Sequence, residues 1–184
     1  MRWTICAALA VAGLGACNHP SPYLGSFAVD VDAAAADHLA FMKSLVHTTN
    51  PADAEKFNRV MEAQARSEAQ RDYGHAHLDL APDHTFSWTH GDKGGDVVET
   101  GTWDDSEARP RAGALAGADV LLTAAARNGQ PVPDSPVAGA ATIDGKLRAL
   151  RRDAADRDRL TLQFTTVVGG TTPTLTTLVL RRAR

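Results

Sequence analysis

The segment Ala76–Trp88 reads AHLDLAPDHTFSW, and its alternation decides the fold class of this chain. Apolar and polar residues alternate on both sides of Pro82-Asp83-His84, which is typical of two half-buried β-strands joined by a turn. A loop of three residues lets the large apolar side chains share one face, in the pairs Leu80–Phe86 and Leu78–Trp88. A loop of two residues would scatter them over both faces, whereas a buried face fixes the register. We therefore predict a hairpin with a three-residue loop at 82–84.

The same register places Ala76 opposite His90 and gives His84 the last loop position. That position usually adopts the left-handed conformation that glycine favours, so His84 carries a modest strain. A second hairpin is predicted near the C-terminus, where strands over 159–168 and 172–182 flank Gly169-Gly170. A loop at 169–171 brings the apolar residues of both strands onto one face, in the pairs Leu162–Leu178 and Leu160–Leu180.

Two helices are predicted upstream of the first hairpin, over about 32–72. Asp32 is a suitable N-cap for the first helix, and Asn50 before Pro51 is a strong start for the second, which Gly74 ends. Apolar residues at helical spacing mark the sides expected to be buried: Leu39, Met42, Leu45 and Val46 in the first helix, and Phe57, Val60, Met61 and Ala65 in the second. The charged residues of the second helix are expected to form a solvated face: Glu55, Lys56, Arg59, Glu62 and Arg66.

Further strands are predicted over 25–30, 97–103 and 120–123, and another begins near Ala140 with a turn near Asp144-Gly145. Residues 104–118 and the proline-rich 128–136 are expected to be loops. The chain is therefore predicted to be mainly β with two N-terminal helices. Its strands, about seven or eight with most of them over about 75–182, are expected to form an antiparallel meander, and such meanders commonly close into barrels or curl over a core.

The N-terminus carries a secretion signal over residues 1–16. Arg2 precedes an uncharged apolar stretch of about a dozen residues, which is too short to span a bilayer because a spanning helix needs roughly 20. Leu14-Gly15-Ala16-Cys17 follows, and this segment resembles the lipobox of bacterial lipoproteins. The resemblance implies cleavage before Cys17 and a membrane anchor through acyl chains on that residue. An ordinary cleaved signal followed by an unrelated cysteine is the alternative.

Residues 17–22 are then the lipidated cysteine and a polar, proline-rich tether, and residues 23–184 form a single domain. By the same resemblance, Asn18 in place of an aspartate indicates the outer membrane, with the protein facing the periplasm. Cys6 leaves with the signal and Cys17 carries lipid, so no disulfide is expected in the domain. This compartment is the main reason why nucleic acid is not expected as a partner.

The charge of the chain is unevenly distributed. Removal of the signal leaves 18 basic and 22 acidic residues, a net charge of −4, yet residues 140–184 contain nine Lys/Arg and four Asp/Glu. We expect acidic residues of the same fold to compensate this basic segment, because Asp153, Asp156 and Asp158 interrupt it. The alternative is a surface for anionic lipid or glycan.

The order of several short motifs resembles the small lipocalin-like lipoproteins and secreted domains of bacteria. The motifs are Gly25-Ser26-Phe27, the segment Leu78 to Phe86, Gly101-Thr102-Trp103 and a closing Leu178-Val179-Leu180-Arg181-Arg182. The resemblance implies a β-barrel-like fold over residues 25–184 and no single function. The chain departs from the family pattern at His84, where the family has glycine, and in the insertion at 104–118.

Two groups of residues are candidates for a site. The apolar residues expected inside the sheet form either a packed core or a ligand cup: Phe27, Leu78, Leu80, Phe86, Trp88, Trp103 and Phe164. We favour the core, because helices that cap the sheet would leave less room for a ligand. His75, His77 and Asp79 share the opposite face and are weak candidates for a metal site, since a third histidine is missing there.

The sequence favours binding over catalysis. It contains neither a Gly-x-Ser-x-Gly nucleophile motif nor a His-Glu-x-x-His metal motif, so we expect neither an enzyme nor a cofactor. The predicted function is a membrane-anchored binding or interaction module of the envelope, with a small apolar ligand or an envelope protein as partner. A structural or stress-linked lipoprotein with a filled core is the alternative.

Overall fold

The computed structural model describes residues 21–45, 51–92, 95–105, 117–132, 146–168 and 172–183. The predicted signal, Cys17, most of the tether and the strand start near Ala140 lie outside these residues. The described strands are β1 (Gly25–Val29), β2 (His77–Leu80), β3 (Thr85–Asp92), β4 (Gly95–Asp104), β5 (Val120–Arg127), β6 (Gln130–Pro131), β7 (Leu147–Arg152), β8 (Arg159–Val168) and β9 (Thr172–Arg182).

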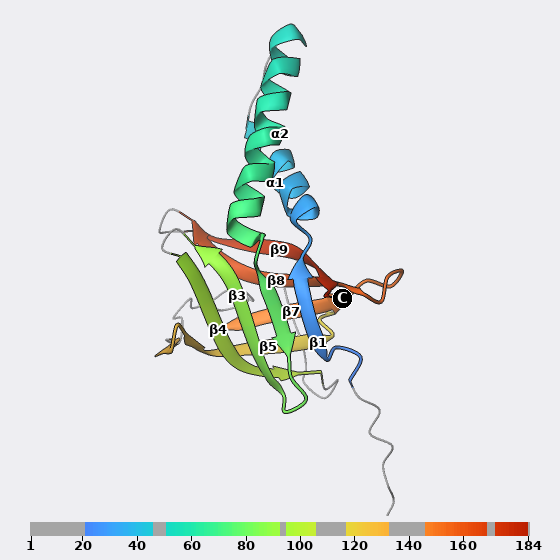
Figure 1. The fold of residues 1–184 in the computed structure, drawn as a ribbon, viewed down its shortest axis with the longest axis vertical. Helices are drawn as coiled ribbons and strands as arrows, with labels where there is room; N and C mark the ends of the chain where they lie inside the picture. Colours follow the sequence, from blue (N-terminus) through green and yellow to red (C-terminus); the bar gives the residue numbers. More distant parts are fainter. Residues whose placement is uncertain are drawn as a thin grey trace, which may run out of the picture.

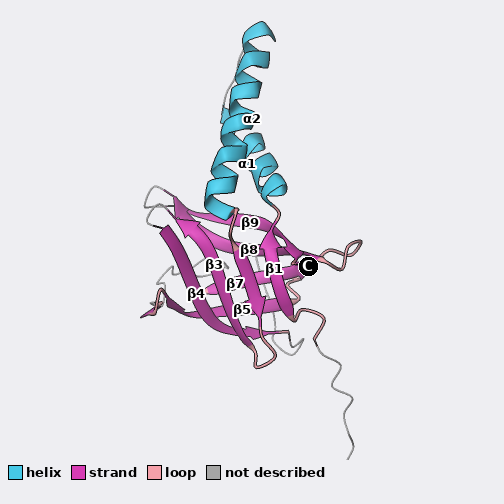
Figure 2. Cartoon of the chain, in the orientation of Figure 1, coloured by secondary structure: helices cyan, strands magenta, loops and turns pink. Residues whose placement is uncertain are grey.

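These strands form a closed antiparallel barrel (Figures 1 and 2). The strand order is β4-β3-β2-β1-β9-β8-β7-β5-β6, and an additional β4–β5 pairing joins the ends of the first eight strands. This confirms the predicted fold class. The short β6 pairs only with the end of β5, and it corrects the prediction that 128–136 is entirely loop.

Both predicted hairpin registers are confirmed. Leu78 faces Trp88 and Leu80 faces Phe86 across β2 and β3, and the β8–β9 pairs Leu162–Leu178 and Leu160–Leu180 also form. His84 has a φ of 62°, as its loop position requires. The predicted pair Ala76–His90 is not part of the ladder, which begins at His77–Thr89. The Ala76 amide instead donates a hydrogen bond to the Tyr73 carbonyl at 3.0 Å, in the turn that follows the preceding helix.

The barrel closes at an irregular point of the β4–β5 ladder, where the register shifts between Thr100 and Gly101. A Cβ atom at residue 101 would collide with the carbonyl oxygen of Thr123 on β5. A glycine inside a strand often marks such a close approach of another backbone. The closure therefore depends on the glycine of the Gly-Thr-Trp motif.

A helical hairpin is inserted between β1 and β2. It consists of α1 (Val31–Leu45) and α2 (Pro51–Tyr73), and it projects from one end of the barrel, as Figure 1 shows. We call this hairpin the stalk. Neither helix is long and apolar enough to cross a membrane, and the same holds for every helix among the described residues.

The buried side of the stalk is narrower than the sequence predicts. On α2 the buried residues are Met61, Ala65 and Ala69, whereas Phe57 and Val60 are exposed. The prediction that these two are buried is wrong, because α1 is the helix that packs along α2 and it covers one stripe. Gly74 ends α2 as predicted, with its amide 2.9 Å from the Gln70 carbonyl.

The N-cap of α1 is Asp30, two residues before the predicted Asp32. A carboxylate oxygen of Asp30 accepts a hydrogen bond from the Ala33 amide at 3.1 Å, and its other oxygen accepts one from the Arg181 guanidinium at 2.7 Å. The hydrogen bond from Arg181 and the one from Ala33 hold the pKa of the Asp30 carboxyl below its ordinary value, against the opposing effect of burial. The cap is also the joint between α1 and the end of β9.

This lowered pKa predicts a pH-dependent contribution to stability. The ionised Asp30 stabilises the fold above its ordinary pKa of about 4, and the contribution is lost as the pH falls through the lower pKa of the folded state. Asp30→Asn keeps a good N-cap but cannot ionise, so we expect a loss of less than about 1 kcal/mol at neutral pH. Urea unfolding of both proteins from pH 7 to pH 2 measures the difference. It should vanish at the acid end, and a difference independent of pH would contradict the role of the ion pair.

Candidate functional site

The predicted core or cup residues meet inside the barrel. Six of them are 0–3 % exposed: Phe27, Leu78, Leu80, Phe86, Trp88 and Trp103. Phe164 is partly buried and packs against this cluster. Residues from the opposite wall, among them Leu122, Leu150, Leu162 and Leu180, have no exposed area at all. A side chain without exposed area borders no space that a water molecule could enter, so the described inward residues pack as a core.

A buried ion cluster lies inside the barrel next to this core. The Glu99 side chain on β4 is 1 % exposed and the Arg148 side chain on β7 is 5 % exposed, and Arg148 Nη2 lies 2.8 Å and 3.0 Å from the two carboxylate oxygens. The half-exposed Arg127 on β5 donates a further hydrogen bond to Glu99 through Nε at 2.9 Å. Two guanidinium groups therefore share one carboxylate, which is a structural arrangement typical of a charge that must be buried.

The surroundings of this cluster join it to the apolar core. Glu99 lies opposite Trp88 in the β3–β4 ladder, and the Arg148 guanidinium stands 5.4 Å from the centre of the Phe164 ring. Neither Glu99 nor Arg148 is among the site residues predicted from the sequence. The signal was present, because Glu99 is two and four residues before Gly101 and Trp103 and so points to the same face. The sequence pattern does not identify Arg148 as the partner of Glu99, because Arg148 lies 49 residues further along the chain.

The other end of the barrel is closed by the first described residues. Arg152 and Arg182 each donate a hydrogen bond to the Pro22 carbonyl at 2.9 Å, and Arg182 donates another to the Leu24 carbonyl at 2.7 Å. The Arg152 guanidinium also stands 4.8 Å from the centre of the Tyr23 ring. The chain therefore joins the barrel firmly at the end away from the stalk (Figure 1).

Acidic residues neutralise part of the basic C-terminal segment. Arg181 pairs with Asp30 at 2.7 Å and with Asp156 at 3.6 Å, and Arg159 pairs with Asp153 at 3.4 Å. These pairs are the compensation that we expected within one fold.

The weak metal candidates are not brought together. His77 Nε2 lies 3.6 Å from an Asp79 oxygen, but His75 precedes β2 and pairs with Asp96 at 2.6 Å. The expectation that all three share one strand face is therefore wrong for His75, which belongs to the turn after α2. Within the described part of the chain, no group of three or more His, Cys, Asp or Glu residues could hold a metal ion.

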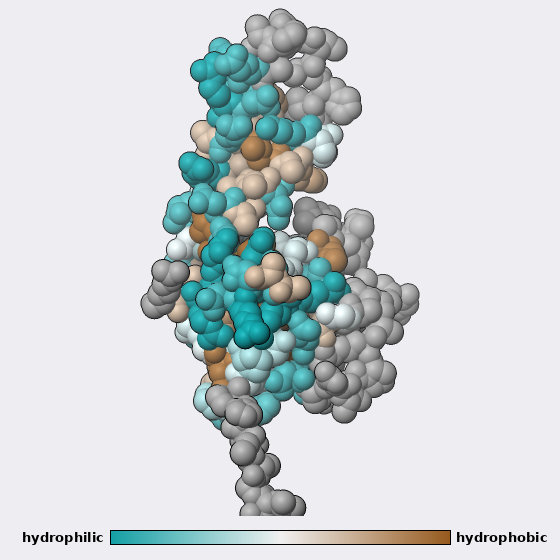
Figure 3. Space-filling view, turned by 90° about the vertical axis from the view of Figure 1, so that its right-hand side faces the viewer, coloured by the Kyte–Doolittle hydropathy of each residue, from teal (hydrophilic) through white to brown (hydrophobic). Residues whose placement is uncertain are grey.

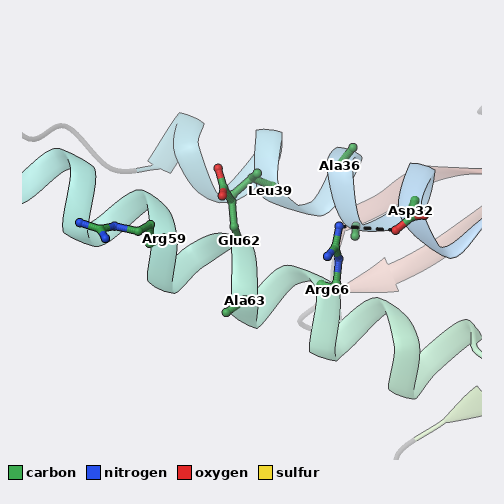
Figure 4. A pocket seen from close by; sticks show the side chains of 8 residues that line it. Asp32, Ala36, Leu39, Arg59, Glu62, Ala63 and Arg66 are labelled. Carbon is green, nitrogen blue, oxygen red and sulfur yellow. Dashed lines mark ion pairs between the residues drawn. The ribbon is translucent and has the colours of Figure 1, made fainter.

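The stalk carries a groove of about 430 Å³ along one flank, between α1 and α2. Figure 4 shows its lining. Four of the lining residues are small or apolar, Ala35, Ala36, Leu39 and Ala63, and four are charged residues of both signs, Asp32, Arg59, Glu62 and Arg66. Arg66 and Asp32 are 3.7 Å apart, and Glu62 lies 3.7 Å from Lys43 on α1. All of these charged side chains are well exposed.

Exposed apolar residues also gather on the stalk. Phe41 is 60 % exposed, Val60 57 % and Phe57 37 %, and they are three of the five large apolar residues that are exposed in the described chain. Figure 3 shows brown and pale-brown residues among the hydrophilic ones along the stalk. Single exposed apolar residues are common, and three of them on one projecting element make the stalk a candidate interaction surface.

Comparison with known protein families, with curated proteins and with solved structures found no match to this chain. Function is therefore inferred from the packed interior of the barrel and from the exposed stalk.

Proposed function

We propose that this chain is a membrane-anchored, non-enzymatic lipoprotein of the bacterial envelope that acts as an interaction module and presents its stalk to another protein. The observation that carries this proposal is the position of the stalk. It projects from the end of the barrel opposite to the segment that leads into β1, where the Pro22 carbonyl accepts hydrogen bonds from Arg152 and Arg182 (Figure 1). An anchor at Cys17 therefore leaves the stalk pointing away from the membrane.

Simple lengths support this arrangement. The four residues from Cys17 to Ser21 span at most about 14 Å. An acylated Cys17 would therefore keep the end of the barrel away from the stalk close to the lipid headgroups. The 23 residues of α2 form a helix of about 35 Å. The stalk would thus reach well beyond the barrel, into the space where envelope proteins are met.

The packed interior favours interaction over carriage of a small ligand. The inward residues that would line a cup, such as Phe27 and Leu122, have no exposed area. A small apolar ligand would need these side chains to move apart, at the cost of the packing that they make. The stalk, by contrast, already exposes apolar residues and a groove to solvent.

The anchor is tested by replacing one atom. Cys17→Ser is expected to leave an unacylated precursor that retains its signal, because the acylated thiol is the substrate of processing in the family that the lipobox resembles. Labelling of cells with a radioactive fatty acid, followed by isolation of the protein, measures the result, with the unchanged chain as control. A labelled Cys17→Ser protein would show that the anchor assignment is wrong.

The role of the stalk is tested by placing a photo-crosslinking amino acid at Val60 and, as a matched control, at the exposed Gln130 on the barrel. Irradiation of intact cells should yield an adduct of one defined mass from position 60 and none from position 130. Adducts from the barrel position alone would overturn the proposal that the stalk is the contact element. Mass spectrometry of the adduct identifies the protein that is bound.

A further inference from the structure

We infer that the groove of the stalk binds the stalk of a second copy of this chain, with the two α2 helices antiparallel. This inference rests on the proposed function of the stalk as the contact element, and it names the partner. It is carried by the order of charges along α2 and by the lining of the groove.

Arg59, Glu62 and Arg66 of α2 line the groove, and Glu55, one turn before Arg59, lies on the same side of the helix by its spacing. Glu55 and Arg59 form an ion pair along the helix at 3.2 Å. In an antiparallel pair of helices, two residues face each other when their numbers add to a constant. A two-fold axis between positions 60 and 61 makes Glu55 face Arg66 of the second copy, and Arg59 face its Glu62. Symmetry repeats each pair, so all four charges of both helices find opposite charges.

The same residues argue against a parallel pair. In a parallel dimer each residue faces its own counterpart, so Glu55 would face glutamate and Arg59 would face arginine. Like charges facing each other across a helix pair are unfavourable, and charge patterns of this kind select the orientation of coiled coils.

The lining of the groove allows a helix to approach closely. Ala35, Ala36 and Ala63 are small, and Leu39 adds an apolar contact. The distance between packed helices lies between about 8 and 10 Å, depending on the side chains at the contact, and alanine favours the shorter distance. The groove therefore combines small and apolar residues with charged residues whose order along α2 is complementary to itself in an antiparallel pair.

The lengths of the two helices fit the same arrangement. Lys43 near the end of α1 pairs with Glu62, so the first turns of α2 extend beyond α1, as Figure 1 shows. Asp32 contacts Arg66, which in the dimer faces Glu55 of the other copy. The α1 helix of each copy thus lies level with the first turns of the other α2. The barrels of such a dimer stand at opposite ends of the paired stalks.

Engineered cysteines test the pairing in the full chain with Cys6→Ser and Cys17→Ser, which removes the native thiols. A chain with both Glu55→Cys and Arg66→Cys should form a disulfide-linked dimer on mild oxidation. The two positions are about 16 Å apart along one helix, too far for a bond within the chain. Chains with either cysteine alone should stay monomeric on a non-reducing gel. A dimer from Glu55→Cys alone would overturn the antiparallel arrangement.

Charge reversal tests the same contact without cysteines. Arg59→Glu should weaken the dimer roughly tenfold in sedimentation experiments, because it places glutamate opposite glutamate twice. Adding Glu62→Arg to the same chain should restore the dimer. Arg71→Glu is the matched control, since Arg71 lies outside the groove lining and pairs with its neighbour Asp72, and it should have no effect.

Absence of any dimer in these experiments would overturn the second copy as partner. It would leave the proposed function standing if position 60 still forms an adduct with a different protein in cells.

Discussion

Glu99→Gln is expected to destabilise the protein, lowering its free energy of unfolding by about 3–5 kcal/mol. The change keeps the size of the side chain but removes the charge that balances Arg148, which is 5 % exposed and has lost most of its contact with water. A buried guanidinium that has lost its carboxylate destabilises the protein more than the removal of both charged groups does. Urea unfolding monitored by tryptophan fluorescence measures the loss.

Two variants test whether the destabilisation comes from the buried ion pair or from the loss of any carboxylate. Asp72→Asn removes a carboxylate from an exposed pair with Arg71, outside the groove lining, and should leave the stability almost unchanged. Glu99→Leu combined with Arg148→Met removes both buried charges, and it should cost much less than Glu99→Gln. A double variant that is as unstable as the single one would show that the ion pair is not the origin of the effect.

Trp88→Ala is expected to destabilise the protein by about 3–5 kcal/mol. Trp88 is 2 % exposed, faces Leu78 across the β2–β3 ladder and stacks at 5.6 Å on the ring of His90. The barrel wall holds its neighbours in place, so the lost side chain leaves a cavity that cannot collapse completely. Thermal and urea unfolding measure the difference.

Phe41→Ala is the matched control for this loss. It also removes an aromatic ring, but Phe41 is 60 % exposed on the stalk, so the expected change is within about 0.5 kcal/mol. If the unfolding midpoint of Trp88→Ala equals that of the unchanged protein, Trp88 does not stabilise the core as described. The pair of variants therefore compares the barrel interior with the stalk surface in one chain.

The hairpins were predictable because strand alternation and turn chemistry act over a few residues. Pro82-Asp83-His84 and Gly169-Gly170 mark the turns, and the demand for one apolar face then selects the register. The helix boundaries were less predictable. Asp32 and Asp30 are both suitable caps, and Asp30 is chosen because Arg181, at the far end of the chain, lies next to it in the barrel.

The burial of helical side chains was predictable only in part. Helical spacing places Phe57, Val60 and Met61 near one another on α2, but spacing does not reveal how wide a stripe its neighbour covers. The stalk has one such neighbour, α1, so Met61 is buried while Val60 stays exposed. A helix packed on the barrel wall would have buried more of the same residues.

Most of the strand and helix segments, the turn positions and the inward faces of the strands could be predicted from the sequence, because they follow from short-range periodicity. The tertiary structure decided which segments meet. The β4–β5 closure, the contact between Glu99 and Arg148 and the projection of the stalk away from the barrel all join or separate residues far apart in the chain. Periodicity shows that a face is buried, but the partner that covers it is selected by the packing of the whole chain.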